Sequence, residues 1–203
     1  MPDPKPNVER WRATVAALSA GLPVPLLLGL IDRLSGGNPQ FVGDLGGRGL
    51  YQIAPNIAEA NGVDSDSLFD PQVNISLAVE MLRRRANEIV ERAPGISSGD
   101  LGLIAIASYL WGPGTILPYV EPGDTAASVF AKLGDPEVEQ FALDVFQRAA
   151  AYTPTSMQPS NGNAVEQPKK EPSTLRMVLY LGVPFVLVSG AIWYFGRNKE
   201  DDS

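Results

Sequence analysis

The sequence predicts a mainly α-helical domain over residues 1–152, followed by a linker, 153–173, a single membrane-spanning helix, 177–195, and a charged tail, 196–203. Three observations support this fold class. Apolar residues recur at helical spacing through much of the first 152 residues. Four glycines lie between positions 43 and 49, which predicts a tight loop or a small hairpin between helices. Residues 177–195 carry no charge and are long enough to cross a hydrocarbon core of about 30 Å.

The first two helices follow from their apolar spacing and from the glycines and prolines around them. Trp11, Val15 and Leu18 predict an amphipathic helix over 8–20. A second helix is expected to begin at Pro23 or Pro25 and to carry the stripe Leu27, Leu30, Ile31 and Leu34. Two glycines, at 36 and 37, are expected to end it.

The later helices have equally local signals. Asp70 followed by Pro71 is typical of a helix start, and the apolar spacing continues to about residue 93. Further helices are expected over 99–110 and 136–152, which gives six or seven helices in all.

The C-terminal part differs in composition. Residues 153–173 are rich in Pro, Ser, Asn, Gln and Lys without apolar periodicity, which is typical of a flexible linker. At the other end, residues 1–12 contain acidic residues and three early prolines, so no secretory signal peptide is expected there.

Composition excludes several kinds of chemistry. The chain has no histidine and no cysteine, so imidazole catalysis, disulfides and thiolate ligands are ruled out. No metal site and no cofactor is expected. The formal net charge of −7 argues against a nucleic-acid partner, which would require a clustered basic face.

Three ordered motifs carry a family resemblance. They read LSGGNPQFVGDLGGRGLYQIAP at 34–55, LFDPQVNI at 68–75 and SYLWGPG at 108–114. Together they resemble the soluble lytic transglycosylase family of the lysozyme superfamily, whose members typically read E-S-G-x-N-P, G-A-x-G-L-M-Q, L-F-D-P-x-x-N-I and A-Y-N-x-G-P-G. The resemblance spans about residues 22–120. It implies a lysozyme-like helical fold and a cleft for peptidoglycan glycan strands.

The resemblance also implies a catalytic acid that this chain lacks. The family protonates the departing glycosidic oxygen with the glutamate of its E-S motif, and Leu34 stands at that position. Leucine has no proton to donate, so the catalytic residue is unknown. Asp44, in the glycine-rich loop, is the candidate for a relocated acid, with a loop-stabilising turn as the alternative. Asp32 is expected to point away from the cleft, because two helical residues differ in direction by about 200°.

Four residues are candidates for substrate binding. Ser35, Gln52 and Tyr109 match the family motifs, and Trp111 adds an aromatic plane that could stack on a sugar. The alternatives are a helix-ending turn for Ser35, a hydrogen-bonded loop for Gln52 and core packing for both aromatic residues. Leu110 replaces the family's asparagine.

These observations leave three hypotheses. The first is a membrane-anchored, lytic-transglycosylase-like protein that binds peptidoglycan glycan strands but is catalytically degenerate, a pseudoenzyme. The second is an active transglycosylase that uses Asp44, and the third is a structural or assembly protein with an unused cleft. The expected partners are glycan strands and a lipid bilayer. The expected location is a host membrane or the internal membrane of a phage virion, where virion proteins would be further partners.

Overall fold

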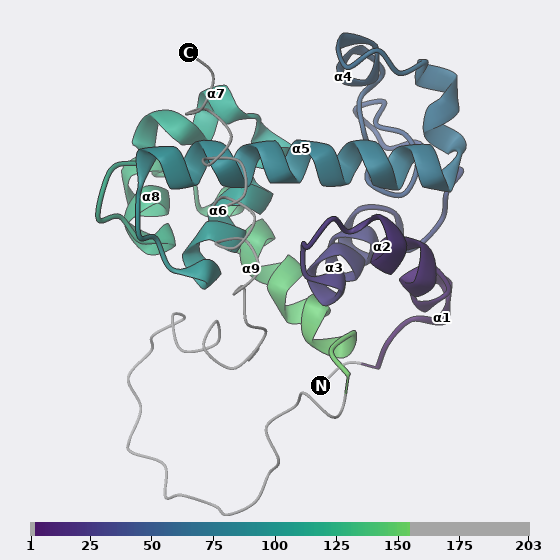
Figure 1. Ribbon diagram of the computed structural model, residues 1–203, viewed down its shortest axis with the longest axis horizontal. Coiled ribbons are helices and arrows are strands. Elements are labelled where there is room, and N and C mark those ends of the chain that lie inside the picture. Colours follow the sequence, from purple (N-terminus) through teal and green to yellow (C-terminus); the bar gives the residue numbers. More distant parts are fainter. Residues whose placement is uncertain (1–2, 155–203) are drawn as a thin grey trace, which may run out of the picture.

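A computed structural model describes residues 3–154, and these residues fold almost entirely into helices (Figure 1). The elements of this region are α1 (Pro6–Glu9), α2 (Arg12–Leu18), α3 (Val24–Ser35), α4 (Pro55–Ala60), the 3₁₀ helix η1 (Ser65–Phe69), α5 (Pro71–Arg92), α6 (Ser98–Trp111), α7 (Pro113–Ile116), the 3₁₀ helix η2 (Leu117–Tyr119), α8 (Ala126–Leu133) and α9 (Pro136–Ala151). The predicted helical class is therefore confirmed for the described residues.

One predicted helix is wrong in its extent. Residues 8–20 form two helices, α1 and α2, rather than one. Pro6 starts α1 at its first position, and the chain turns at Arg10 and Trp11. Both of these side chains donate hydrogen bonds to the carbonyl oxygen of Gly37, at 3.0 Å each. This shared contact places the break against the chain that follows α3.

Helix α3 carries Leu34 in its last turn, at the position where the resembled family has its glutamate. Its apolar stripe is buried at Leu27, Leu30 and Ile31, and it ends at Gly36 in the left-handed conformation, with φ of 58°. Its backbone packs directly on α9, because a Cβ atom at Gly29 would lie only 2.7 Å from the carbonyl oxygen of Val145. The middle of α3 and the second half of α9 are thereby held close together.

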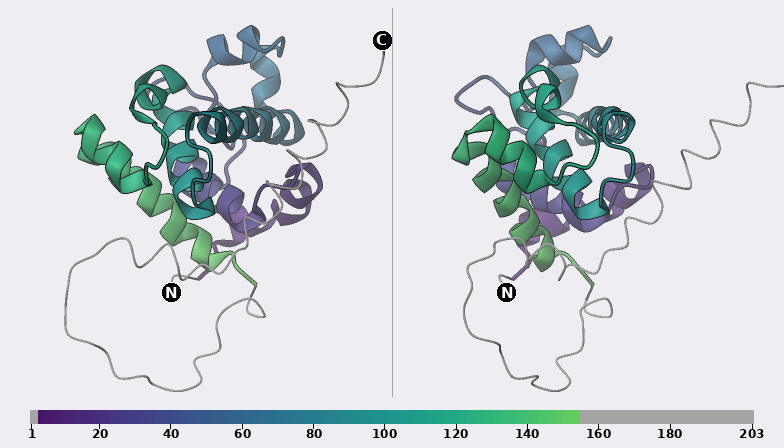
Figure 2. Two further views of the ribbon diagram at one scale, coloured as in Figure 1. Left: turned by 60° about the vertical axis from the view of Figure 1, so that its left-hand side comes forward. Right: turned by 90° about the vertical axis from the view of Figure 1, so that its left-hand side faces the viewer.

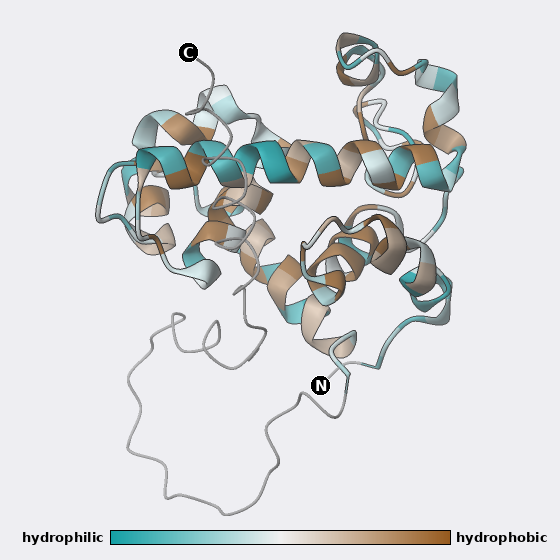
Figure 3. Ribbon diagram, viewed as in Figure 1, coloured by the Kyte–Doolittle hydropathy of each residue, from teal (hydrophilic) through white to brown (hydrophobic). Residues whose placement is uncertain are grey.

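The long helix α5 crosses the domain and packs against α6 (Figure 1). Asp70 caps it as predicted, accepting hydrogen bonds from the backbone N–H groups of Gln72 and Val73. Figure 3 shows hydrophilic and hydrophobic residues alternating along α5, as expected for a helix with one buried face.

The glycine-rich segment is confirmed as a small loop. Antiparallel bridges join Val42 with Arg48 and Arg48 with Ile53, which folds residues 42–53 into a tight double turn. In Figures 1 and 2, α9 ends beside the N-terminal segment, so the two ends of the described chain lie on the same side of the domain.

The predicted membrane helix, 177–195, and the tail, 196–203, lie outside the described residues, as does the linker beyond residue 154. Within residues 3–154, no helix is both long enough and apolar enough to cross a bilayer.

Candidate functional site

An open cleft of about 1150 Å³ lies between the end of α3, the glycine-rich loop, the end of α6 and the first half of α9. Four of its lining residues are positions that the sequence predicts to matter: Leu34 at the position of the family's acid, and the candidates Asp44, Gln52 and Trp111. The remaining lining residues are Arg33, Phe41, Gly43, Leu45, Gly47, Ala54, Leu110, Pro136, Glu137, Gln140, Phe141 and Asp144.

Leu34 presents an apolar, half-buried side chain to this cleft from the last turn of α3. It continues the stripe that packs on the core. Asp32 lies on the other side of the helix, as expected. Its buried carboxylate accepts hydrogen bonds from Lys5 Nζ at 2.6 Å, the Tyr152 hydroxyl at 2.9 Å and the Arg148 guanidinium at 3.2 Å. Asp32 is therefore fully engaged away from the cleft.

Gln52 is held rigidly in the floor of the cleft. Its backbone is left-handed, with φ of 53°, which is uncommon for a residue with a side chain. Its amide nitrogen donates to the carbonyl oxygens of Gly49 at 2.8 Å and Phe41 at 3.0 Å. Both amide hydrogens are thus used within the loop, and the carbonyl end of the side chain packs beside Gly43.

Asn74, on α5, supports this loop and is part of the LFDPQVNI motif, from which no individual role for it was predicted. Its side-chain oxygen accepts from the Tyr51 N–H at 2.8 Å, and its nitrogen donates to the carbonyl oxygens of Arg48 and Leu68 at 3.0 Å each. A fully buried amide with three such bonds fixes the backbone that leads into Gln52.

Tyr109 and Ser35 are not among the residues that line the cleft. The Tyr109 hydroxyl donates to the carbonyl oxygen of Tyr51 at 2.9 Å, and burial raises the pKa of this phenol well above its usual range. The Ser35 hydroxyl donates to the carbonyl oxygen of Ile31 and accepts from the Gly37 N–H. This geometry favours the core interpretation for Tyr109 and the helix-ending turn for Ser35.

Asp44 and Leu45 stand at the exposed tip of the glycine-rich loop. Asp44 lines the cleft, and no described side chain is paired with its carboxylate. Leu45 is 99% exposed. The loop therefore offers one carboxylate and one apolar side chain to anything that enters.

The wall formed by α9 contributes residues that sequence reasoning missed. Glu137, Gln140, Phe141 and Asp144 all line the cleft. The helix itself was expected, but no local motif marks these positions, and they lie more than 100 residues beyond Leu34 in the chain. Only the packing of α9 on α3 brings the two together.

The family model of the transglycosylase SLT domain matches residues 13–125. No curated protein sequence is similar enough to count as a match.

Two solved structures share the fold. The 70 kDa soluble lytic transglycosylase of Escherichia coli aligns with a TM-score of 0.55 and 17% identity. The lytic transglycosylase Slt of Pseudomonas aeruginosa, solved as an inactive glutamate-to-glutamine mutant, aligns with a TM-score of 0.55 and 21% identity. Each alignment covers 70% of this chain, but only 24% and 23% of those two chains, respectively.

The expected lysozyme-like helical fold is thereby confirmed for the described domain. The family model covers more than half of the 203 residues, and its match includes the end of α3, the glycine-rich loop and the end of α6. This chain belongs to the transglycosylase SLT domain family.

Proposed function

We propose that this protein binds peptidoglycan glycan strands in the cleft and cleaves them poorly or not at all. The observation that carries the proposal is Leu34, an apolar side chain at the cleft end of α3, in the motif position where the family has its glutamate. Family membership supports the glycan as the ligand. The P. aeruginosa relative, described as inactive after a glutamate-to-glutamine change, is an example of how one carboxyl group governs activity in that protein.

The proposed loss of activity follows from the chemistry of glycosidic cleavage. The departing oxygen must receive a proton, and general acid catalysis typically contributes about 10²–10⁴-fold in rate. Leu34 cannot supply that proton. Leu110, also in the cleft, is a second apolar side chain at a position that is polar in the family.

Asp44 supports a second candidate function, an active transglycosylase with a relocated acid. Its carboxylate lines the same cleft on the opposite, loop side. Its exposure argues against this role, because a carboxyl group that acts as an acid near neutral pH usually sits in an apolar pocket.

A digest of peptidoglycan with the purified full chain tests both. Released fragments are analysed by mass spectrometry for anhydro-sugar ends, and binding is measured separately by pull-down with insoluble sacculi. We expect the wild-type protein to bind sacculi without significant turnover. Leu34→Glu is expected to raise turnover by about 10²-fold or more, because it restores a proton donor to an intact cleft.

The control variant is Asp44→Asn. Robust wild-type turnover that Asp44→Asn abolishes would establish the relocated acid and overturn the proposal. Failure of both the wild type and Leu34→Glu to bind sacculi would instead favour the structural role with an unused cleft.

We also propose that residues 177–195 anchor the protein in a host membrane or in the internal membrane of a virion. Their 19-residue uncharged composition supports a single span. With such an anchor, the bilayer becomes a second partner, and the domain would bind glycan strands close to the membrane.

A further inference from the structure

The tip of the glycine-rich loop exposes a cluster of apolar side chains. Among residues 3–154, six large hydrophobic side chains are exposed, and three of them, Phe41, Val42 and Leu45, lie within five positions of this loop. Leu45 is 99% exposed, Val42 53% and Phe41 40%. Exposed apolar side chains that gather in one place are typical of a surface that meets an apolar partner. These three residues are called the apolar loop tip below.

The loop presents these side chains from a turn whose backbone is bonded within itself. The Gly46 N–H donates to the carbonyl oxygen of Gly43 at 2.8 Å, so Asp44 and Leu45 are the central residues of a β-turn. The Gly43 N–H donates to the carbonyl oxygen of Gly47 at 2.9 Å. Backbone groups that are bonded in this way need no water, which lowers the cost of moving the tip into a less polar medium.

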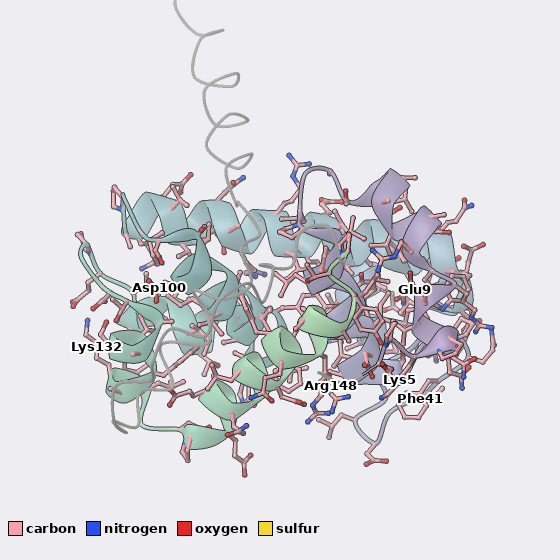
Figure 4. All side chains as sticks on the ribbon, turned by 90° about the horizontal axis from the view of Figure 1, so that it is seen from below. Lys5, Glu9, Phe41, Asp100, Lys132 and Arg148 are labelled. Carbon is pink, nitrogen blue, oxygen red and sulfur yellow. The ribbon has the colours of Figure 1, made fainter. Side chains whose placement is uncertain are left out.

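The end of the described chain lies near the loop side of the cleft. Phe41 and Asp144 line the same cleft, and Asp144 is paired with Arg148 at 3.1 Å. Arg148 bonds Asp32 at 3.2 Å, and the Tyr152 hydroxyl bonds the same carboxylate at 2.9 Å. Figure 4 shows Phe41 and Arg148 toward the same edge of the domain. The last residues of α9 are therefore only a few side chains away from the cleft that the loop borders.

The chain itself supplies an apolar partner for this tip. Residues 177–195 are the uncharged run proposed above as a membrane anchor, and only the stretch 155–176 separates them from the described domain. A chain of that length has a random-coil reach of about 25 Å. Such a tether makes contact with the bilayer intramolecular, with an effective concentration in about the millimolar range. A weak apolar contact is then enough to hold the loop at the membrane.

We propose that the apolar loop tip inserts into the interface of the bilayer and forms a second membrane contact of this protein. The inference goes beyond glycan binding and rests on the proposed anchor. Shallow insertion removes the exposed surface of Phe41, Val42 and Leu45 from water. Because Phe41 and Leu45 also line the cleft, this contact turns the loop side of the cleft toward the membrane.

The charges around the tip determine which lipid suits it. Asp44 lies next to Leu45, and its carboxylate has no ion pair within residues 3–154. Glu137 lines the same cleft, and the whole chain has a formal net charge of −7. An anionic lipid surface repels these charges, whereas a zwitterionic one does not. The contact is therefore assigned to zwitterionic lipid such as phosphatidylcholine.

A single label tests the contact, because the chain has no cysteine of its own. Full-length Val42→Cys is labelled with the dye NBD and reconstituted into phosphatidylcholine vesicles that contain nitroxide-labelled lipid. We expect the emission of the dye to shift to the blue and to be quenched by the nitroxide. Labelled Tyr119→Cys is the matched control, because Tyr119 is also exposed but does not line the cleft. It should show neither the shift nor the quenching.

Two further substitutions at Leu45 test whether the apolar surface drives the contact. In the labelled Val42→Cys chain, Leu45→Asp should remove both the blue shift and the quenching, because a second carboxylate opposes entry into the lipid. Leu45→Ile keeps the apolar surface and should keep both signals. The Leu45 side chain is almost fully exposed, so neither substitution removes a packing contact. Addition of phosphatidylglycerol to the vesicles should reduce the quenching.

Flotation of the same vesicles measures the anchor independently. If the full chain does not float with the vesicles, the anchor is wrong and the loop contact fails with it. If the chain floats but the label at position 42 is not quenched, only the loop contact is wrong. A blue shift without quenching would show that protein, such as a second copy of the chain, covers the tip.

Two other results would also overturn the inference. Equal quenching in Leu45→Asp would show that the dye enters the lipid without help from Leu45. Quenching that does not fall with phosphatidylglycerol would overturn the assignment to zwitterionic lipid. Sacculus binding enters none of these measurements, so the proposed glycan function stands or fails separately.

Discussion

The side chain of Leu34 shows how one residue can keep a helix intact while changing the chemistry available beside it. Leucine has a high helix propensity and extends the apolar stripe of α3, so the last turn of that helix is well formed. The guanidinium of the neighbouring Arg33 lies over the Phe141 ring of α9 and is paired with Asp144 of the same helix. The end of α3 therefore contributes the apolar side chain of Leu34 and the ion-paired guanidinium of Arg33 to the cleft.

Three tyrosines predict how the stability of the domain depends on pH. Burial raises the pKa values of Tyr51, Tyr109 and Tyr152, and for Tyr152 the hydrogen bond to Asp32 raises it further. The folded pKa of each phenol thus exceeds the unfolded value of about 10, and the neutral form is stabilising. This contribution is fully present below pH 10 and is lost as the pH rises above it.

We therefore expect the free energy of unfolding in urea to fall steadily above about pH 10. Absorbance of phenolate measures ionisation in the same samples. Tyr51 and Tyr152, which are buried, and Tyr109, which is partly buried against the core, should ionise only as the protein unfolds. Six tyrosines that titrate together near pH 10 in the folded protein would contradict the prediction.

Asn74 joins helix α5 to the glycine-rich loop through hydrogen bonds to the loop backbone. Leu50, Tyr51 and Ile53 bury the end of this loop in the core, and hydrogen bonds with Asn74 fix the backbone at Arg48 and Tyr51. Leu68, at the end of η1, is tied to the same amide. The position of Gln52 in the cleft is thus set by Asn74, a residue of α5 that lies 22 positions further along the chain.

Asn74→Ala should destabilise the domain by about 2–4 kcal/mol, because three buried backbone groups lose their partner. Ser76→Ala, on the exposed side of the same helix, is the control and should change stability by less than about 0.5 kcal/mol. Urea unfolding measures both. Sacculus binding should weaken with Asn74→Ala at temperatures where the variant is still folded. Equal stability of the two variants would show that the loop holds its shape without Asn74.

At the scale of the whole molecule, the two ends of the domain are tied together. Lys5 from the N-terminal segment and Arg148 from α9 meet at Asp32, and Figure 4 shows their side chains on the same side of the domain. Arg12 also donates to the carbonyl oxygen of Tyr152. Residue 154, the last described residue, therefore lies near the N-terminal segment, at the opposite end of α9 from Pro136 and Glu137.

The proposed anchor is tested on the full chain by carbonate extraction of membranes. We expect the full-length protein to stay in the membrane fraction, because a helix over 177–195 satisfies its own backbone hydrogen bonds and carries no charge into the hydrocarbon. A truncated chain that ends at Pro172 should be released. Full-length protein in the soluble fraction would exclude the anchor.

Several elements could be read from short stretches of sequence. The Asp70 cap, the glycines after α3 and the density of glycine at 43–49 act over a few residues, so their outcome does not depend on the rest of the fold. Helix α8 has comparable local signals that were missed, a capping box at Thr125 and a left-handed Gly134 at its end.

The sequence by itself determined the helical class, the family and the candidate cleft residues Leu34, Asp44 and Gln52, because periodicity, caps and motifs are local. Tertiary structure alone decided between Tyr109 and Trp111, which lie two residues apart on α6: the first bonds to Tyr51, and the second faces the cleft. It also brought Phe141 to Arg33. The direction of a side chain depends on which helix packs against it, and that partner comes from a distant part of the chain.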